Sequence, residues 1–136
     1  MTDEFGFEVN LEQPYEQAIK LVTDALKSEG FGVLTQIDVK ATIKKNLGED
    51  FRPYTILGAC NPNLAHQALS ADAFLGLMLP CNVTVETGSN GYSIVRIANP
   101  EIMLQVGALQ NNPTLQKVAK EASLRLNRVA SRLANE

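Results

Sequence analysis

The sequence predicts an α+β domain of two layers, in which two long amphipathic helices cover one face of a mainly antiparallel, five-stranded sheet. Segments in which apolar and polar residues alternate occur five times, which is typical of strands with one buried face. Two longer segments repeat apolar residues every three or four positions, which is typical of helices with one buried stripe. With 136 residues, 45% of them hydrophobic, the chain has the size of one domain with its own core, and we expect a single domain over residues 1–136.

The first predicted pair of elements is a strand followed by a long helix. Residues 5–11 alternate between apolar and polar side chains and indicate a half-buried strand. Pro14 suits the first turn of a helix, where its missing N–H is not needed, and Gly30 suits the position just after the end. One face of this helix carries the apolar residues Tyr15, Ala18, Ile19, Val22, Ala25 and Leu26.

The second predicted pair is a strand at residues 31–37 and a short helix at 38–46. Phe31, Val33 and Ile37 are expected on one face of the strand. Asp38 is a typical N-cap for the short helix, and Gly48 is a typical stop.

The third predicted strand covers residues 54–60 and ends at Asn61-Pro62, which starts a helix that we expect to continue in pieces to Met78. The turn sequence 88–91, Gly-Ser-Asn-Gly, predicts a hairpin between strands at 81–87 and 92–98.

The remaining segment is predicted to be helical at both ends. A short helical piece is expected at 101–106, a loop at 107–113, and a long helix from Thr114 onward. The apolar face of this last helix consists of Leu115, Val118, Ala119, Ala122, Leu126, Val129, Ala130 and Leu133. The predicted order is therefore β-α-β-α-β-α-β-β-α-α.

Composition narrows the class of protein. A net charge of −3 argues against general nucleic-acid binding, which requires a concentrated positive surface. No apolar run is long enough to cross a bilayer, and the acidic first residues differ from the basic start of a signal peptide. We therefore expect a cytoplasmic protein with no membrane partner. Thiols in that compartment are normally kept reduced.

The candidate site comprises the two cysteines, each of which stands where a strand meets a loop. Cys60 ends the strand in the segment YTILGACNP (54–62), and Cys81 begins the strand in the segment LPCNV (79–83). If these strands are antiparallel neighbours, both cysteines lie at one end of the sheet, and we expect both thiols to point into one interior. Tyr54, Gly58 and Asn61 of the first segment complete the set of candidate ligand-binding residues.

Three functions are compatible with this pair of cysteines. The first, which we favour, is binding of a small ligand, of haem, or of a metal held by Cys60, His66 and Cys81, because sulfur and imidazole suit zinc, copper and haem iron. The second is thiol redox chemistry, with Cys60 as nucleophile next to a helix start and Cys81 as its resolving partner. The third is a structural or partner-binding module, because free cysteine is often a small buried apolar residue. No acid pair, catalytic triad or phosphate loop is recognisable, so binding is favoured over catalysis.

Around these residues the chain resembles a known family. The resemblance lies in Phe51-x-x-Tyr54-x-Ile56-Leu57-Gly58-x-Cys60-Asn61-Pro62, then Ala65 and Ala68, then Leu79-Pro80-Cys81-x-Val83. These features are similar to those of the family catalogued as domain of unknown function number 302. The resemblance implies a compact β-α-β(4)-α domain with the layout of TATA-binding-protein-like folds, no established activity, and a chain in which a homodimer would be unsurprising.

Overall fold

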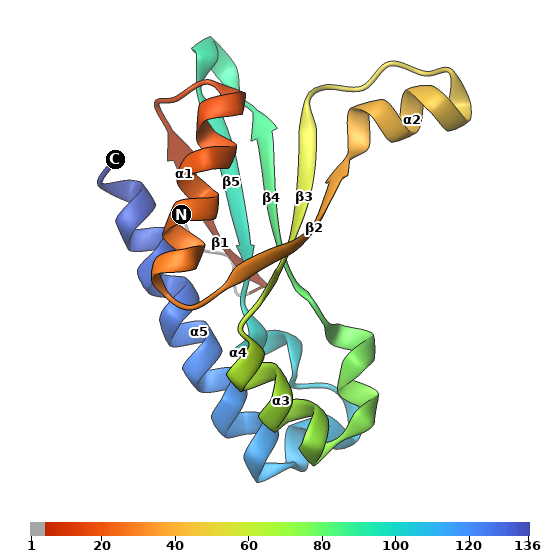
Figure 1. Cartoon of the computed structure of the whole chain (residues 1–136), viewed down its shortest axis with the longest axis vertical. Coiled ribbons are helices and arrows are strands. Elements are labelled where there is room, and N and C mark those ends of the chain that lie inside the picture. The colour runs from red at the N-terminus through yellow and green to blue at the C-terminus, as the bar shows by residue number, and fades with distance from the viewer. Residues whose placement is uncertain (1–4) are drawn as a thin grey trace.

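The computed structural model describes residues 5–136, and its centre is one five-stranded antiparallel sheet (Figure 1). The strands are β1 (Gly6–Leu11), β2 (Gly32–Asp38), β3 (Tyr54–Cys60), β4 (Cys81–Thr87) and β5 (Ser93–Ala98). Their order across the sheet is β1-β5-β4-β3-β2, so β1 and β2 form the two edges. The α+β class and the antiparallel five-stranded sheet predicted from the sequence are confirmed.

Two amphipathic helices, α1 (Tyr15–Ser28) and α5 (Pro113–Ala134), cover one face of this sheet. Their apolar stripes meet the alternate strand residues that point toward them, and this contact forms the main hydrophobic core. The fully buried side chains of this core include Leu11, Val22, Leu26, Leu57, Val83, Val85, Val95, Ile97, Leu126, Val129 and Leu133.

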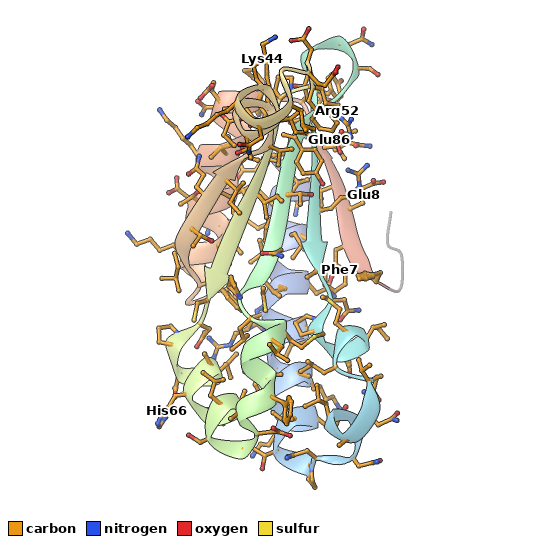
Figure 2. The ribbon with its side chains drawn as sticks, turned by 90° about the vertical axis from the view of Figure 1, so that its right-hand side faces the viewer. Phe7, Glu8, Lys44, Arg52, His66 and Glu86 are labelled. Atoms are coloured by element: carbon orange, nitrogen blue, oxygen red, sulfur yellow. The ribbon has the colours of Figure 1, made fainter. Side chains whose placement is uncertain are left out.

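The other face of the sheet, which we call the open face, has no helix from the described part of the chain packed on it (Figure 2). Strand alternation puts Ile37, Ile56, Ile94, Tyr54, Thr84, Glu86, Arg96 and Glu8 on this face. The face therefore combines apolar and charged side chains.

The prediction that Ile37 shares a face of the strand with Val33 is wrong, because β2 contains a bulge. Val33 pairs with Ala59 and Thr35 pairs with Gly58, so Leu34 is an extra residue in the register. An extra residue reverses the alternation that follows it. Val33 consequently packs against the main core, whereas Ile37 lies on the open face and is 47% exposed.

The short helix α2 (Val39–Leu47) follows β2 and projects beyond the sheet on the side away from α1 and α5 (Figure 1). Asp38 caps its first turn by accepting a hydrogen bond from the Ala41 amide at 3.0 Å. Gly48 ends it in the left-handed conformation with a φ of 68°. No side chain of α2 is buried.

The remaining elements gather at the sheet end opposite α2. They are α3 (Pro62–Ala71), the 3₁₀ helices η1 (Ala73–Met78) and η3 (Gly107–Asn111), and α4 (Pro100–Met103); the short η2 (Ser89–Gly91) forms the hairpin turn. The segment 107–113, expected as a loop, contains η3. A second hydrophobic cluster forms here from Ala68, Leu75, Leu104, Leu115, Val118 and Ala119.

The same dipeptide, Asn-Pro, starts the three helices α3, α4 and α5. Asn61 caps α3, Asn99 caps α4 and Asn112 caps α5, each by accepting a hydrogen bond from a backbone amide of the first turn. Proline then occupies the first helical position, where no N–H is needed.

No helix within residues 5–136 is long and apolar enough to cross a bilayer.

Candidate functional site

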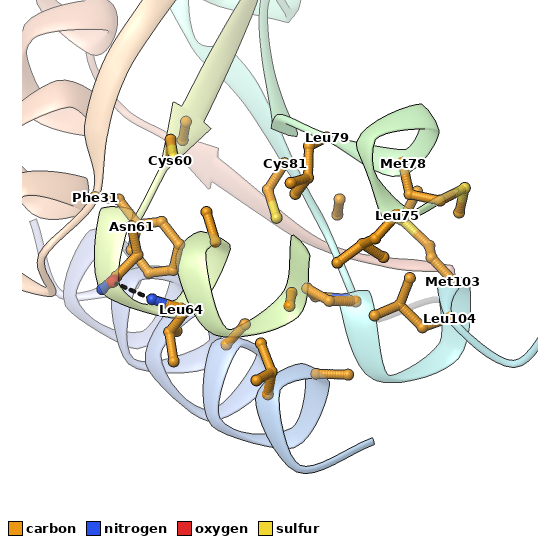
Figure 3. A pocket seen from close by; sticks show the side chains of 18 residues that line it. Phe31, Cys60, Asn61, Leu64, Leu75, Met78, Leu79, Cys81, Met103 and Leu104 are labelled. Atoms are coloured by element: carbon orange, nitrogen blue, oxygen red, sulfur yellow. Dashed lines mark hydrogen bonds between the residues drawn. The ribbon is translucent and has the colours of Figure 1, made fainter. Parts of the chain in front are cut away.

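An apolar pocket lies between the main core and the second cluster, at the end of β3 and the start of β4 (Figure 3). Its volume is about 50 Å³. Phe31, Ala59 and Cys81 reach it from the main core, whereas Leu75 and Leu104 reach it from the second cluster. The two clusters therefore do not close completely onto each other.

Small and sulfur-containing side chains dominate the pocket wall. Six alanines line it: Ala59, Ala65, Ala68, Ala98, Ala119 and Ala122. Both cysteines line it too, as do Met78 and Met103, so every sulfur-containing residue within residues 5–136 lines this one pocket. Among residues 5–136 no charged side chain lines it, and Asn61 carries the one amide side chain.

The two cysteines are neighbours in the sheet, but their side chains leave it in opposite directions. The predicted pairing of β3 with β4 is confirmed, and it puts Ala59, not Cys60, opposite Cys81. Successive side chains of a strand point to opposite faces. The two side chains therefore leave the sheet on opposite faces, yet both cysteines line the same pocket at this end of the sheet, and both are free thiols.

Burial makes Cys81 a weakly acidic thiol. Its sulfur points into the pocket among apolar side chains (Figure 3), and this desolvation, with a smaller effect of Cys60, raises its pKa to about 11. At neutral pH the thiol is thus protonated and is a poor nucleophile.

Cys81 is therefore expected to react slowly with alkylating reagents. In a Cys60→Ser protein at pH 8, iodoacetamide should modify Cys81 at least roughly tenfold more slowly than it modifies glutathione, because less thiolate is present. The rate is measured by mass spectrometry of the intact protein. A rate equal to that of glutathione would show that the Cys81 thiol is not shielded from the reagent and that its pKa is not raised.

Asn61 and Gly58, two other candidates, have structural roles beside the pocket. Asn61 is 7% exposed and accepts a hydrogen bond from the Leu64 amide at 3.1 Å, which fixes the start of α3 against the pocket (Figure 3). Gly58 lies on the open face, where an added Cβ would lie 2.7 Å from Pro80 Cγ and closer still to Thr35 Oγ1. Gly58 is thus explained by close packing.

Tyr54 lies away from the pocket, at the other end of β3. Its ring is 6.2 Å from that of Phe51, and the guanidinium of Arg52 lies 5.6 Å from its centre. The structure therefore does not bring Tyr54 together with the two cysteines.

His66 is exposed on α3 and points away from the molecule (Figure 2). Across residues 5–136, no three His, Cys, Asp or Glu side chains converge as metal ligands. The set Cys60, His66 and Cys81 is thus not assembled in this conformation. The pocket volume of about 50 Å³ is also far below the roughly 300–1,000 Å³ of typical cofactor and ligand sites, so haem does not fit.

Sequence reasoning missed a charged cluster on the open face. Glu86 is buried and accepts hydrogen bonds from Arg52, at 2.6 Å, and from Arg96, which also contacts Glu8. Burial by itself raises the pKa of Glu86, but the two arginines outweigh it, and the pKa lies below its usual value. The alternating pattern assigns position 86 to the solvent side, so only the pairing of β4 with β5 reveals the cluster.

Comparison with known proteins identifies relatives of the same layout. The family model described as "Domain of unknown function DUF302" matches residues 7–133. A crystal structure of an uncharacterized conserved DUF302 protein from Bacillus stearothermophilus is 30% identical, with a TM-score of 0.83 over 96% of this chain and 99% of that chain. No curated protein matches this chain.

Proposed function

This chain belongs to the family described as domain of unknown function DUF302, and we propose that it binds a small, uncharged, apolar molecule in the pocket between its two hydrophobic clusters. One observation carries the proposal: six alanines stand in the wall between the clusters, and they leave space that larger side chains would fill.

An apolar space of this kind is unfavourable unless something occupies it. Protein interiors are packed about as densely as organic crystals. At about 24 cal/mol per Å³, an empty cavity of about 50 Å³ destabilises the fold by about 1 kcal/mol. A ligand that fills the space recovers this free energy and joins the two clusters into one core.

The lining determines the chemistry of the ligand. A charged group would lose its hydration without meeting an opposite charge, because none of the described residues that border the pocket is charged. Cys81 is a protonated thiol, and the two methionines are flexible and polarisable, so they adapt to apolar ligands of different shape. The best-suited ligand is therefore neutral and apolar.

The size of the pocket limits the ligand in the conformation described. An engineered cavity of about 150 Å³ admits benzene, and this pocket has about a third of that volume. A ligand of few atoms fits directly, whereas a larger one requires η1 to move. This helix contributes Leu75 and Met78 to the wall, and its Phe74 and Leu77 are 73% and 81% exposed.

Thiol redox chemistry has less support. A Cys60–Cys81 disulfide would have to join side chains that leave the sheet on opposite faces. Cys81 would also be a slow attacking thiol, since its pKa is raised to about 11. Ligand binding requires neither thiolate.

The proposal is tested by extracting purified protein with organic solvent and analysing the extract by mass spectrometry. Ala119→Leu fills the pocket, and Ala41→Leu makes the same change at an exposed position of α2. The wild type and Ala41→Leu are expected to release an apolar compound, and Ala119→Leu at least roughly tenfold less of it. Equal amounts from wild type and Ala119→Leu, including none from either, would contradict the proposal.

A further inference from the structure

The 3₁₀ helix η1 stands between the pocket and solvent, and it carries two apolar rows that face different ways. A 3₁₀ helix has three residues per turn, so side chains three positions apart form one row. Leu75 and Met78 form a row that lines the pocket. Phe74 and Leu77 form the next row, and both of these side chains are exposed. One short element is therefore both a wall of the pocket and an apolar outer surface.

More exposed apolar side chains lie at this end of the molecule, and we call the whole set the end patch. An added Cβ at Gly76 would lie 3.7 Å from Leu69 Cδ2, so the exposed Leu69 of α3 is next to η1. Helix α4 and the segment after it lie at the same end and add two exposed side chains (Figures 1 and 2). The end patch consists of Leu69, Phe74, Leu77, Ile102 and Val106. Apolar surface gathered in this way is typical of a contact site.

The segments that build this end carry very little charge. Residues 53–85 and 97–116 contain two charged side chains, Asp72 and Glu101. Asp72 is engaged as the cap of η1, where it accepts a hydrogen bond from a backbone amide of the first turn at 2.9 Å. The next basic residue along the chain is Lys117, in α5. Anionic lipid surfaces attract clusters of basic residues, so the end patch matches an electrically neutral surface instead.

From these observations we propose that the end patch contacts the surface of an electrically neutral lipid bilayer, which is the source of the apolar ligand. The inference rests on the proposed function, because an apolar ligand is held by lipid rather than by water. Contact with lipid also removes Phe74 and Leu77 from water. Contact with one leaflet needs no membrane-spanning helix, so the expectation of no membrane partner, which rests on the lack of a long apolar run, does not address it.

Contact with lipid also favours the movement of η1 that admits a ligand. In water, an outward movement of η1 exposes Leu75 and Met78 in addition to the outer row, and this exposure is unfavourable. Against lipid, the same movement transfers these side chains from one apolar surrounding to another. The free energy of opening is therefore lower at the bilayer than in solution, and the open conformation is more populated there.

A single introduced tryptophan tests the contact, because the protein itself contains none. Phe74→Trp puts the reporter in the end patch, and Leu124→Trp puts it at an exposed position of α5. Phosphatidylcholine vesicles are expected to shift the emission of Phe74→Trp to shorter wavelength and to leave that of Leu124→Trp unchanged. The reason is that the indole at position 74 leaves water, whereas the indole at position 124 does not.

Co-sedimentation with the same vesicles measures the affinity. The double variant Phe74→Ser and Leu77→Ser should bind at least roughly tenfold more weakly than the wild type, because it lacks two large apolar side chains. Leu124→Ser makes the same leucine change outside the end patch and should bind as the wild type does. Ala119→Leu fills the pocket and leaves the end patch intact, so it should also bind vesicles as the wild type does. Vesicle binding is thus measured separately from the pocket, and failure of one proposal is distinguishable from failure of the other.

The proposal is overturned if excess vesicles neither shift the emission of Phe74→Trp nor co-sediment with the wild type. It is also overturned if binding requires anionic lipid and is unaffected by the double variant, because charge and not the end patch would then hold the protein. An emission shift of Phe74→Trp that appears on raising the protein concentration without vesicles would show that protein, not lipid, covers the end patch. Circular dichroism confirms that each variant is folded.

Discussion

Replacing Leu104 by Ala is expected to lower the free energy of unfolding by about 2–5 kcal/mol and to increase the uptake of an apolar probe. Leu104 is 6% exposed, lies in the second cluster and borders the pocket. Its truncation removes buried apolar area and also enlarges the existing space. Chemical denaturation measures the first effect, and a shift of the melting temperature by benzene measures the second.

Leu133→Ala is the matched control for this experiment. Leu133 is 1% exposed and belongs to the main core, away from the pocket. It should show a loss of stability of similar size without any response to benzene beyond that of the wild type. If both variants respond equally to benzene, the response is not specific to the pocket. The claim that a ligand-accessible space lies between the two clusters then fails.

Glu86→Gln is expected to destabilise the protein by about 1–2 kcal/mol at pH 7. The side chain of Glu86 is 7% exposed, whereas its partners Arg52 and Arg96 are about half exposed, so solvent screens part of the attraction. The substitution keeps the shape and one accepting oxygen but removes the charge that both guanidiniums contact. Urea denaturation of both proteins at several pH values measures the difference.

The sign of the pH dependence follows from the lowered pKa of Glu86. A carboxyl group whose pKa is lower in the folded state stabilises the fold above its unfolded pKa, and that contribution disappears as the pH falls through the folded value. The difference in the free energy of unfolding between wild type and Glu86→Gln should thus be complete at pH 7 and should narrow below about pH 4.5. Glu49→Gln removes the same charge from an exposed loop and should change stability by less than about 0.5 kcal/mol. A gap that persists unchanged at pH 3 would show that the charge of Glu86 is not the cause.

Local sequence patterns were sufficient to predict the strands and the two long helices, but not the 3₁₀ helix η3 or all of the contacts between elements. Alternation and helical periodicity predicted all five strands and the two covering helices, because burial of one face imposes these periods. The bulge at Leu34 was missed, because an extra residue leaves no trace in composition and appears only when Val33 and Thr35 are matched to β3.

The candidate site was predicted in part for a similar reason. The two cysteines mark the end of the sheet at which the pocket lies, since strand ends can be located from the flanking prolines. The pocket also depends on Met103, Leu104 and Ala119, which lie far from the cysteines in sequence and reach them only through the packing of α4 and α5. The cluster around Glu86 likewise depends on pairing between strands, since a buried carboxylate and a solvated one look alike in an alternating segment.

The pocket itself is tested most directly by NMR of protein labelled with ¹³C at the methionine methyl groups, under xenon pressure. Xenon is an apolar atom that enters dry apolar cavities. Met78 and Met103 border the pocket and serve as internal probes, with Ala119→Leu as the filled control and Ala41→Leu as the exposed one. The account predicts saturable shifts of the Met78 and Met103 signals in wild type and Ala41→Leu that are absent in Ala119→Leu. Signals that do not move in the wild type, or that move equally in Ala119→Leu, would contradict the existence of a ligand-accessible space between the two clusters.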